Sequence, residues 1–261
     1  MATKIPLVLF LILMTSCEEN KTSAYWEKWN FERAQSLAKL FEGRTFENKN
    51  GEQLLYRLLK PLDYDPKKKY PLVVSLHHGG VHGNDNIAQL SSEPAPLLSN
   101  PINRVKYPAF LFVPQCPKGS QFGSFPNIPS VDTKIFEAIS DLEKEFNIDT
   151  TRRYVAGISG GGFGSWHFIC ARPNMFAAAI PICGGGDPKL AKQIIDVPVW
   201  VFHGEKDTNV HVGFARDMIE AIKKEGGNPK YTEFAGAAHY IWDRVESTPG
   251  LIDWLFAQKR K

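Results

Sequence analysis

Residues 155–166 read VAGISGGGFGSW, in which an apolar run passes through a glycine-rich turn into a helical pattern. Glycine between a strand and a helix suits a flexible loop, a phosphate-binding loop or a strained turn that presents a nucleophile. The Walker pattern requires Lys followed by Ser or Thr after its last glycine, whereas Phe163 follows Gly162. The dinucleotide pattern Gly-x-Gly-x-x-Gly fails because Ser159 occupies the place of its second glycine.

The pattern Gly-x-Ser-x-Gly is satisfied by Gly157, Ser159 and Gly161. Between a strand and a helix, this pattern places the serine on a sharp turn with strained backbone angles, and its small neighbours let the turn close. A serine hydroxyl becomes a good nucleophile only when a base takes its proton and an acid orients that base. The pattern therefore predicts a histidine and an acid at neighbouring strand ends.

The rest of the chain has the strands and helices of one large α/β domain. Short apolar runs predict strands at 70–78, 108–116, 152–159, 176–185 and 197–204, with a weaker one at 229–234. Helical patterns lie at 131–146, 163–171, 212–225 and 248–260, after an expected lead-in helix at 25–41. Strands that alternate with helices predict a doubly wound, mostly parallel sheet, and Asn50-Gly51 predicts a hairpin before it. Such sheets bind ligands at the carboxyl ends of their strands.

Two loops at predicted strand ends contain candidates for the acid and the base. Asp207 follows the strand at 197–204, and His239 follows the last strand, before the terminal helix. The resulting chain order of serine, acid and histidine is the order that accompanies this type of nucleophile turn. Glu205 is a rival for the acid, with anchoring of its loop as its other role, and Asp243 is expected to be a structural partner beside the adjacent tryptophan.

The negative oxygen that develops during acyl transfer needs backbone N–H donors. One donor is expected from Gly160, directly after the nucleophile and at the positive N-terminus of the following helix. The second is expected from Gly79, in the loop LHHGGVHGNDN that follows the strand at 70–78. The alternative is that these loop glycines form only a turn.

Metal ions and nucleic acid are both disfavoured as partners. The candidate metal ligands lie in different loops, without His-x-x-x-His spacing or nearby carboxylate pairs, and they are His77, His78, His82, His203 and His211. The formal charge is +3, and the longest single-sign block is the triplet Lys67–Lys69, in a turn-like stretch. Nucleic-acid binding would need clustered basic residues on one face. We expect no metal and no cofactor.

The N-terminus predicts export. Lys4 precedes an apolar run at 5–14, which is too short to span a bilayer and is typical of a secretory signal. The sequence LMTSC that ends at Cys17 is similar to a bacterial lipobox. Residues 1–16 are therefore expected to be a lipoprotein signal peptide, with Cys17 as the acylated first residue of the mature chain. A free or buried cysteine after ordinary signal cleavage is the alternative.

We expect residues 17–24 to be a polar tether and residues 25–261 the folded domain, held on a bacterial membrane in the periplasm or at the cell surface. Export implies a compartment in which disulfides can form. Cys116, Cys170 and Cys183 remain once the lipidation site is set aside. Three is an odd number, so at most one bridge forms and one thiol stays free.

From about residue 42 to 259 the chain resembles the single-domain α/β-hydrolase esterases, a group of carboxylesterases, dienelactone-hydrolase-like proteins, and feruloyl-esterase-like or polyhydroxybutyrate-depolymerase-like proteins. The resemblance lies in YRLLKPLDYDPKKKYPLVVSLHHGGVHGNDN, VPQCP, YVAGISGGGFGSW, IPICGGGDP, VFHGEKD and IDWLFAQKR. It implies a triad of Ser159, Asp207 and His239, with Gly79 and Gly160 as oxyanion donors.

Two positions differ from the family pattern. The family often has His-Gly-x-Gly where this chain has His77-His78-Gly79-Gly80, so a bulky residue stands beside the oxyanion loop. The family also often has Met where this chain has Gly160, which leaves the pocket wall more open. Neither change removes a backbone donor, so hydrolysis is still expected.

Only about a dozen residues separate Gly184 from the next strand at Val197, which leaves no room for a cap domain. An open cleft suits bulky esters on a polymer surface. Together with a lipid anchor, this predicts an exported esterase that removes acetyl or feruloyl groups from polysaccharide. The alternatives are a polyester depolymerase, a general carboxylesterase, a serine peptidase and a catalytically inactive binding lipoprotein. The peptidase is disfavoured because no propeller or second domain is present to select peptides.

Overall fold

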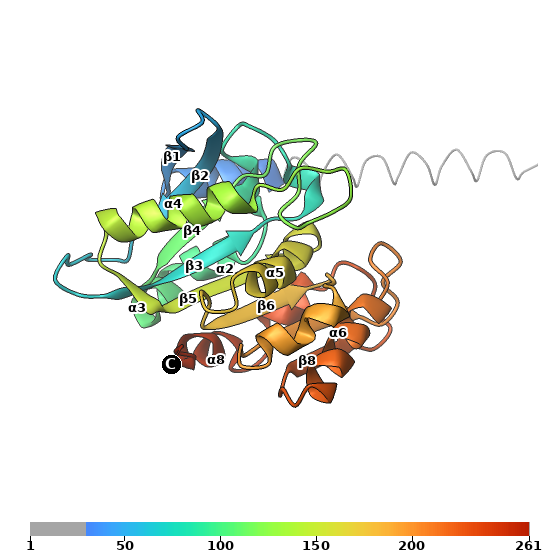
Figure 1. Ribbon diagram of the computed structural model, residues 1–261. Coiled ribbons are helices and arrows are strands. Elements are labelled where there is room, and N and C mark those ends of the chain that lie inside the picture. Colours follow the sequence, from blue (N-terminus) through green and yellow to red (C-terminus); the bar gives the residue numbers. More distant parts are fainter. Residues whose placement is uncertain (1–29, 261) are drawn as a thin grey trace, which may run out of the picture.

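An eight-stranded sheet forms the centre of the molecule, in the order β1-β2-β4-β3-β5-β6-β7-β8 (Figure 1). It is seen in a computed structural model that describes residues 30–260. The strands are β1 (Glu42–Glu47), β2 (Gln53–Leu59), β3 (Tyr70–Leu76), β4 (Phe110–Pro114), β5 (Ile148–Ile158), β6 (Ala178–Ile182), β7 (Trp200–Gly204) and β8 (Lys230–Phe234). β2 pairs antiparallel with β1 and with β4, and all other pairings are parallel. The predicted doubly wound, mostly parallel sheet is confirmed.

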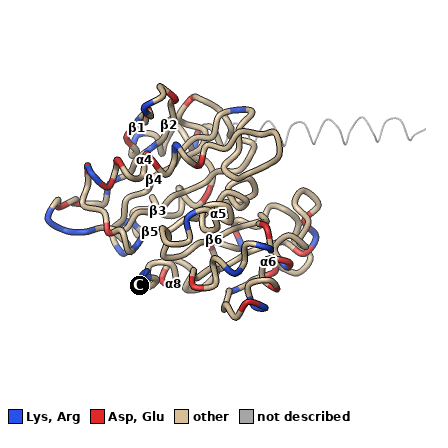
Figure 2. The backbone as a smooth tube through the Cα atoms, viewed as in Figure 1, with Lys and Arg blue, Asp and Glu red and all other residues tan. Residues whose placement is uncertain are grey.

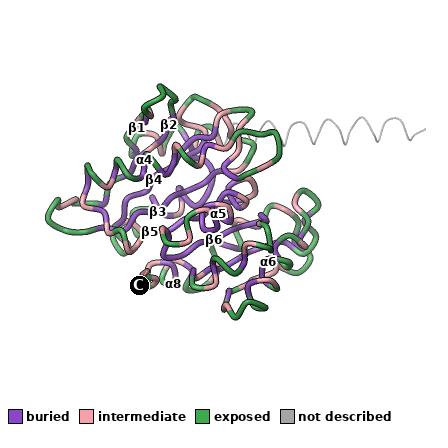
Figure 3. Tube along the Cα trace, in the orientation of Figure 1, coloured by how far each residue is buried: buried purple, intermediate pink, exposed green. Residues whose placement is uncertain are grey.

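Helices cover both faces of the sheet. The α-helices are α2 (Ala95–Ser99), α3 (Pro101–Lys106), α4 (Asp132–Glu145), α5 (Gly160–Ala171), α6 (Gly213–Lys224), α7 (Trp242–Glu246) and α8 (Leu251–Ala257). One apolar cluster joins the sheet to α4, α5 and α6 through residues such as Ile139, Trp166 and Met218. A second cluster on the opposite face includes Leu98 of α2 and Leu255 of α8. Strands β3, β4, β6 and β7 are buried along their whole length for this reason (Figure 3).

The predicted elements are present, with some shifted ends. α5 begins at Gly160 rather than at residue 163, because Ser159 is already its N-cap. The predicted terminal helix is shorter, since Gly250, with φ of 74°, separates α7 from α8. The hairpin expected at Asn50-Gly51 joins β1 to β2. Of the lead-in helix, residues 30–38 are helical.

The signal peptide, Cys17 and the tether lie outside the described residues. Three short 3₁₀ helices were not predicted, namely η1 (Gly79–Val81), η2 (Ala88–Ser91) and η3 (Pro188–Ile194). η3 occupies the segment between β6 and β7, where no cap domain was expected. Within residues 30–260, no helix is both long enough and apolar enough to cross a membrane.

All the parallel strands end at one edge of the sheet, toward the right in Figure 1. The loops after β3, β5, β6, β7 and β8 therefore meet at this edge. The basic triplet Lys67–Lys69 lies before β3, in an exposed loop at the opposite edge (Figure 2). The triplet is therefore remote from the edge at which the predicted site residues gather.

Candidate active site

Ser159 lies between the last residue of β5 and the first residue of α5. Its φ of 56° and ψ of −114° fall outside the regions that a non-glycine residue ordinarily adopts. The Ser159 N–H donates to the carbonyl of Ile182 over 2.8 Å, which ties the turn to the end of β6. Such strain persists only where the surroundings hold it, and it is common at active sites. The turn has the sharp geometry that the Gly-x-Ser-x-Gly pattern predicted.

Glycine is required at two positions of this turn and not at a third. A Cβ on Gly157 would lie 2.5 Å from the Gly161 oxygen, and a Cβ on Gly161 would lie 2.0 Å from the Leu76 oxygen. Both distances are too short for any side chain. A Cβ on Gly160 would instead be in ordinary contact with the nitrogen of Gly79, at 3.5 Å. The glycine at 160 therefore leaves the wall beside the serine open without being needed for the turn.

Two backbone N–H groups lie together beside the serine. Gly160 is the first helical residue of α5, where N–H groups have no acceptor within the helix and the helix dipole is positive. Gly79 begins η1, and among residues 30–260 its N–H has no hydrogen-bond acceptor. The close approach of these two glycines forms a site that suits a small negatively charged oxygen.

Asp207 and His239 form a hydrogen-bonded pair in which the carboxylate is buried and the imidazole is partly exposed. The Nδ1 of His239 lies 2.7 Å from Oδ2 of Asp207, and the carboxylate side chain is fully buried. Its other oxygen accepts hydrogen bonds from the N–H groups of Asn209 and Val210, each at 2.9 Å. Burial alone would raise the pKa of Asp207, but the hydrogen bonds from Val210 and His239 hold this pKa below its ordinary value. The carboxylate is therefore ionised beside the imidazole.

Two further buried side chains contact this pair. The Nε2 of His203 lies 2.9 Å from the Val210 carbonyl and 3.3 Å from Oδ2 of Asp207. The Cys183 thiol donates to the His239 carbonyl over 3.5 Å. Sequence reasoning assigned neither residue to the site. A polar His203 inside the apolar strand VPVWVFHG was the signal that could have indicated it.

Ser159 and His239 both have a hydrogen bond to the end of β6. Ser159 is bonded to Ile182, and the next residue, Cys183, contacts the carbonyl of His239. A hydrogen bond from the Ser159 hydroxyl to the imidazole is not formed among residues 30–260. In enzymes without substrate this contact is often long, and it tightens when substrate binds.

The other candidate acids have different contacts. Glu205 accepts the N–H of Gly236 over 2.7 Å, which is the loop-anchoring role that was its alternative. Asp243 is exposed in the first turn of α7, and its neighbour Trp242 donates to Glu246. Asp207 is the acid that contacts the histidine.

The five histidines that were candidate metal ligands do not form a cluster within residues 30–260. Potential ligand atoms of Cys183, His203 and Asp207 do lie within 4.8 Å of one another. Burial, followed by the Asp207 charge, raises the pKa of Cys183 to about 12, so its thiol is protonated. A metal would have to displace that proton and compete with His239 for the carboxylate. Hydrogen bonds already explain the contacts of this group.

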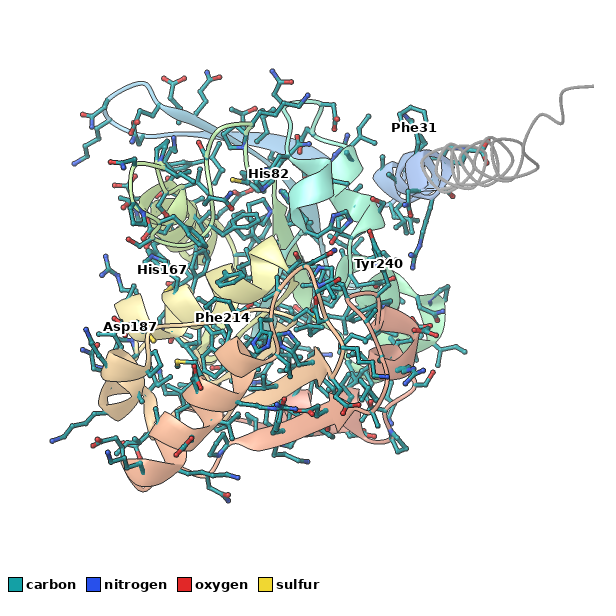
Figure 4. All side chains as sticks on the ribbon, turned by 90° about the vertical axis from the view of Figure 1, so that its right-hand side faces the viewer. Phe31, His82, His167, Asp187, Phe214 and Tyr240 are labelled. Atoms are coloured by element: carbon teal, nitrogen blue, oxygen red, sulfur yellow. The ribbon has the colours of Figure 1, made fainter. Side chains whose placement is uncertain are left out.

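Aromatic side chains line the same edge (Figure 4). The Phe163 ring, one turn after Ser159, lies 5.5 Å from that of Phe125 and 5.9 Å from that of Phe214, in edge-to-face geometry. Figure 4 shows Phe214 on one side of this face and Tyr240, next to His239, on the other. The three phenylalanines form a partly exposed aromatic row beside the nucleophile turn.

Comparison with known proteins gives a consistent result. The profile of the dienelactone hydrolase family matches residues 126–247. The chain is 33% identical over 140 residues to a probable feruloyl esterase C of Aspergillus terreus, covering 53% of this chain and 48% of that protein. It is 29% identical over 138 residues to a bifunctional acetylxylan esterase/xylanase of Neocallimastix patriciarum, covering 52% and 19%.

Among solved structures, a thermostable esterase has 36% sequence identity and a TM-score of 0.82, over 86% of this chain and 64% of that one. The chain spans about half the length of the Aspergillus relative and about a fifth of the Neocallimastix relative. The region that matches the dienelactone hydrolase family contains the serine turn, Asp207 and His239. The chain accordingly has the α/β-hydrolase fold, and its residues 126–247 are similar to the dienelactone hydrolase family.

Proposed function

We propose that this protein hydrolyses carboxylic esters through an acyl-enzyme on Ser159. One observation carries the proposal: a strained serine turn lies at the same sheet edge as an Asp207–His239 pair whose side-chain atoms are 2.7 Å apart. The esterase relatives and the thermostable esterase structure support the same reaction class.

In the proposed reaction, Nε2 of His239 takes the Ser159 hydroxyl proton as the oxygen attacks the ester carbonyl. The N–H groups of Gly79 and Gly160 stabilise the negative oxygen that forms. His239 then gives its proton to the departing alcohol, which leaves an acyl group on Ser159. Water, deprotonated by His239, attacks this acyl group and releases the acid. Asp207 holds the tautomer and orientation of the imidazole throughout.

We propose as substrates acetyl or feruloyl esters on polysaccharide. The names of the relatives, feruloyl esterase and acetylxylan esterase, support this class. The open wall at Gly160 and the absence of a cap between β6 and β7 allow a bulky alcohol to approach. The aromatic row at Phe163 favours a feruloyl over an acetyl group, because an aromatic acyl group gains ring contacts there.

The reaction is tested with p-nitrophenyl acetate and the variant Ser159→Ala. Wild type is expected to show a burst of p-nitrophenol, followed by a slower steady state, and a mass increase of one acetyl group on the protein. The variant should lack both. Equally slow hydrolysis by wild type and variant would show that the chain is a catalytically inactive binding protein instead.

The substrate class is tested with acetylated xylan, feruloylated arabinoxylan and polyhydroxybutyrate. Release of acetate or ferulate from the polysaccharides, without polyester cleavage, is the expected result. Activity on short alkyl esters alone would indicate a general carboxylesterase. Phe163→Ala should lower kcat/KM for the feruloyl ester by about tenfold relative to the acetyl ester, since an aromatic ring contact with the acyl group is lost.

We also propose that the protein is an exported lipoprotein, anchored through Cys17 after removal of residues 1–16. The basic residue, short apolar run and lipobox-like LMTSC support this. Expression in a bacterium with labelled palmitate should label the wild type and not Cys17→Ser. Label on both proteins, or on neither, would contradict the anchor without affecting the proposed reaction.

A further inference from the structure

Two histidines in the loop between β3 and η1 have no part in the mechanism above. His77 is completely buried, and its Nε2 lies 2.9 Å from the N–H of Cys116. Because that N–H can only donate, Nε2 carries a lone pair and the ring proton is on Nδ1. Nδ1 lies 2.8 Å from the His78 carbonyl and therefore donates to it. His77 thus fixes the direction of one backbone carbonyl.

That carbonyl belongs to the peptide unit that also contains the Gly79 N–H. A trans peptide is planar, so its C=O and its N–H point in opposite directions. A fixed His78 carbonyl therefore fixes the direction of the predicted oxyanion donor. The N–H of His78 is held in turn by Ser92 Oγ, at 3.2 Å.

The side chain of His78 makes the next contact in the loop. Its Nδ1 accepts the N–H of Gly80 over 3.1 Å and caps η1. The ring is therefore neutral, with its proton on Nε2. A proton on Nδ1 would place two donors against each other and break the cap. The loop has this conformation only while His78 is unprotonated.

The surroundings of His78 keep it neutral. Burial, and then the charges of His239 and His82, lower the pKa of His78. His77 precedes it in the chain, and burial lowers the pKa of His77 to about 3. Glu93, next to Ser92, forms an ion pair with the lead-in helix. The proposed catalytic base, His239, is thus near enough to oppose protonation of His78.

We propose that His78 is a positioning residue of the oxyanion loop and makes that loop sensitive to acid. Neutral His78 holds Gly80, and with it the Gly79 N–H that faces the reacting oxygen. When Nδ1 takes a proton from water, η1 loses its cap, and the Gly79 donor keeps only the restraint that His77 places on the His78 carbonyl. The site then loses oxyanion stabilisation independently of protonation of His239. This inference rests on the proposed function, since it assigns a role within the same site.

The first test needs no substrate. In ¹⁵N-labelled protein at pH 8, the His78 ring, assigned by comparison with His78→Asn, is expected to be the Nε2–H tautomer. On acidification, the Gly80 amide resonance should shift with the same midpoint as the His78 ring. An Nδ1–H tautomer, or a Gly80 amide that does not follow the ring, would overturn the proposal even if ester hydrolysis were confirmed.

The second test compares His78→Asn with His78→Ala. Asn can accept the Gly80 N–H through Oδ1 but does not titrate, whereas Ala removes the cap. His78→Ala should lose about tenfold or more in kcat, with similar KM, and lose affinity for a phenylboronic acid in parallel. His78→Asn should restore most of both losses. Equal kcat and boronate affinity in the two variants would contradict a positioning role.

The pH dependence separates this role from a structural one. Below the optimum, log kcat/KM of the wild type should fall more steeply than one proton allows, because His78 and His239 both titrate. In His78→Asn the slope should be that of a single proton, with folding followed by circular dichroism at each pH. A single-proton slope in both proteins would contradict the acid sensitivity. Absence of any ester hydrolysis would contradict the proposed function instead. The role of His78 would then be decided by the tautomer test alone.

Discussion

At the scale of single residues, the site depends on which acid after β7 points inward. Glu205 and Asp207 are two positions apart in one loop, and both were candidates from the sequence. In the structure, the two side chains differ in burial and in hydrogen-bond partner. Asp207 is buried and contacts His239, whereas Glu205 is exposed and bonds the Gly236 N–H. Their chemical similarity makes them a matched pair for mutation.

Asp207→Asn should lower kcat/KM by about 10³ to 10⁴, since an amide donates where the carboxylate accepted and favours the wrong tautomer of His239. Glu205→Gln should change kcat/KM by less than about threefold, because Gln still offers an oxygen to the loop. Hydrolysis of p-nitrophenyl acetate measures both variants. A larger loss for Glu205→Gln than for Asp207→Asn would reverse the assignment of the acid.

At the scale of elements, the turn from β5 to α5 is packed backbone against backbone. The N-terminal turn of α5 lies so close to the ends of β3 and β6 that Gly161 and Gly162 have no room for a Cβ. Gly160, between the serine and these glycines, faces Gly79 and the Gln121 side chain at ordinary contact distances. Adjacent glycines in one turn therefore have different roles, which the sequence GISGGG does not distinguish.

Gly161→Ala should lower the free energy of unfolding by about 3 kcal/mol or more, since its Cβ would overlap the Leu76 carbonyl and push β3 away from α5. Gly160→Ala should change that free energy by less than about 1 kcal/mol, because its Cβ finds ordinary contacts. Urea denaturation gives both values. Equal destabilisation by the two changes would show that the turn tolerates or rejects both side chains alike.

The elements that sequence could predict are those with a strong local pattern. The apolar strands and the amphipathic helices α4 and α6 were all expected, because an element buried on one or two faces has a regular spacing of apolar residues in its sequence. The short helices α2 and α3 were not, because Pro96 and Pro101 in a run of a few residues read as loop. The same holds for the candidate site. The Gly-x-Ser-x-Gly pattern and the predicted strand ends indicated Ser159 and Asp207, whereas the contacts of His78 are visible only in the folded structure.

At the scale of the whole molecule, burial shields three thiols and one imidazole, which become accessible to reagents and protons only when the protein unfolds. Cys116, Cys170 and Cys183 are all buried and unpaired, so no disulfide forms within residues 30–260. Burial raises the pKa values of these thiols to about 12, 11 and 12. His77 is also buried, and its ring lies 4.8 Å from that of Phe122.

The thiols should be unreactive in the native protein. With Cys17 replaced by Ser, Ellman's reagent should titrate none of the three within minutes at pH 8, because they are neither accessible nor ionised. In guanidinium chloride without reductant, all three should react. Only one reactive thiol after denaturation would mean that the other two are joined in a disulfide.

Acid should destabilise the fold partly through His77. Its folded pKa of about 3 lies below the ordinary value, so between about pH 6.5 and 3 the unfolded chain binds a proton that the native chain does not. Stability due to the neutral ring is present above that window and falls by about 1.4 kcal/mol per pH unit within it. His77→Gln should be less stable at pH 7, yet its free energy of unfolding should fall less steeply from pH 6 to 4, by about that amount per unit. Urea denaturation of wild type and His77→Gln across this range measures the slopes. The expected result is a smaller slope for His77→Gln, because a histidine that folding keeps neutral links protons to unfolding. If His77→Gln kept the wild-type slope, His77 would bind its proton equally in the folded and unfolded chain, and the neutral, buried ring would have to be wrong.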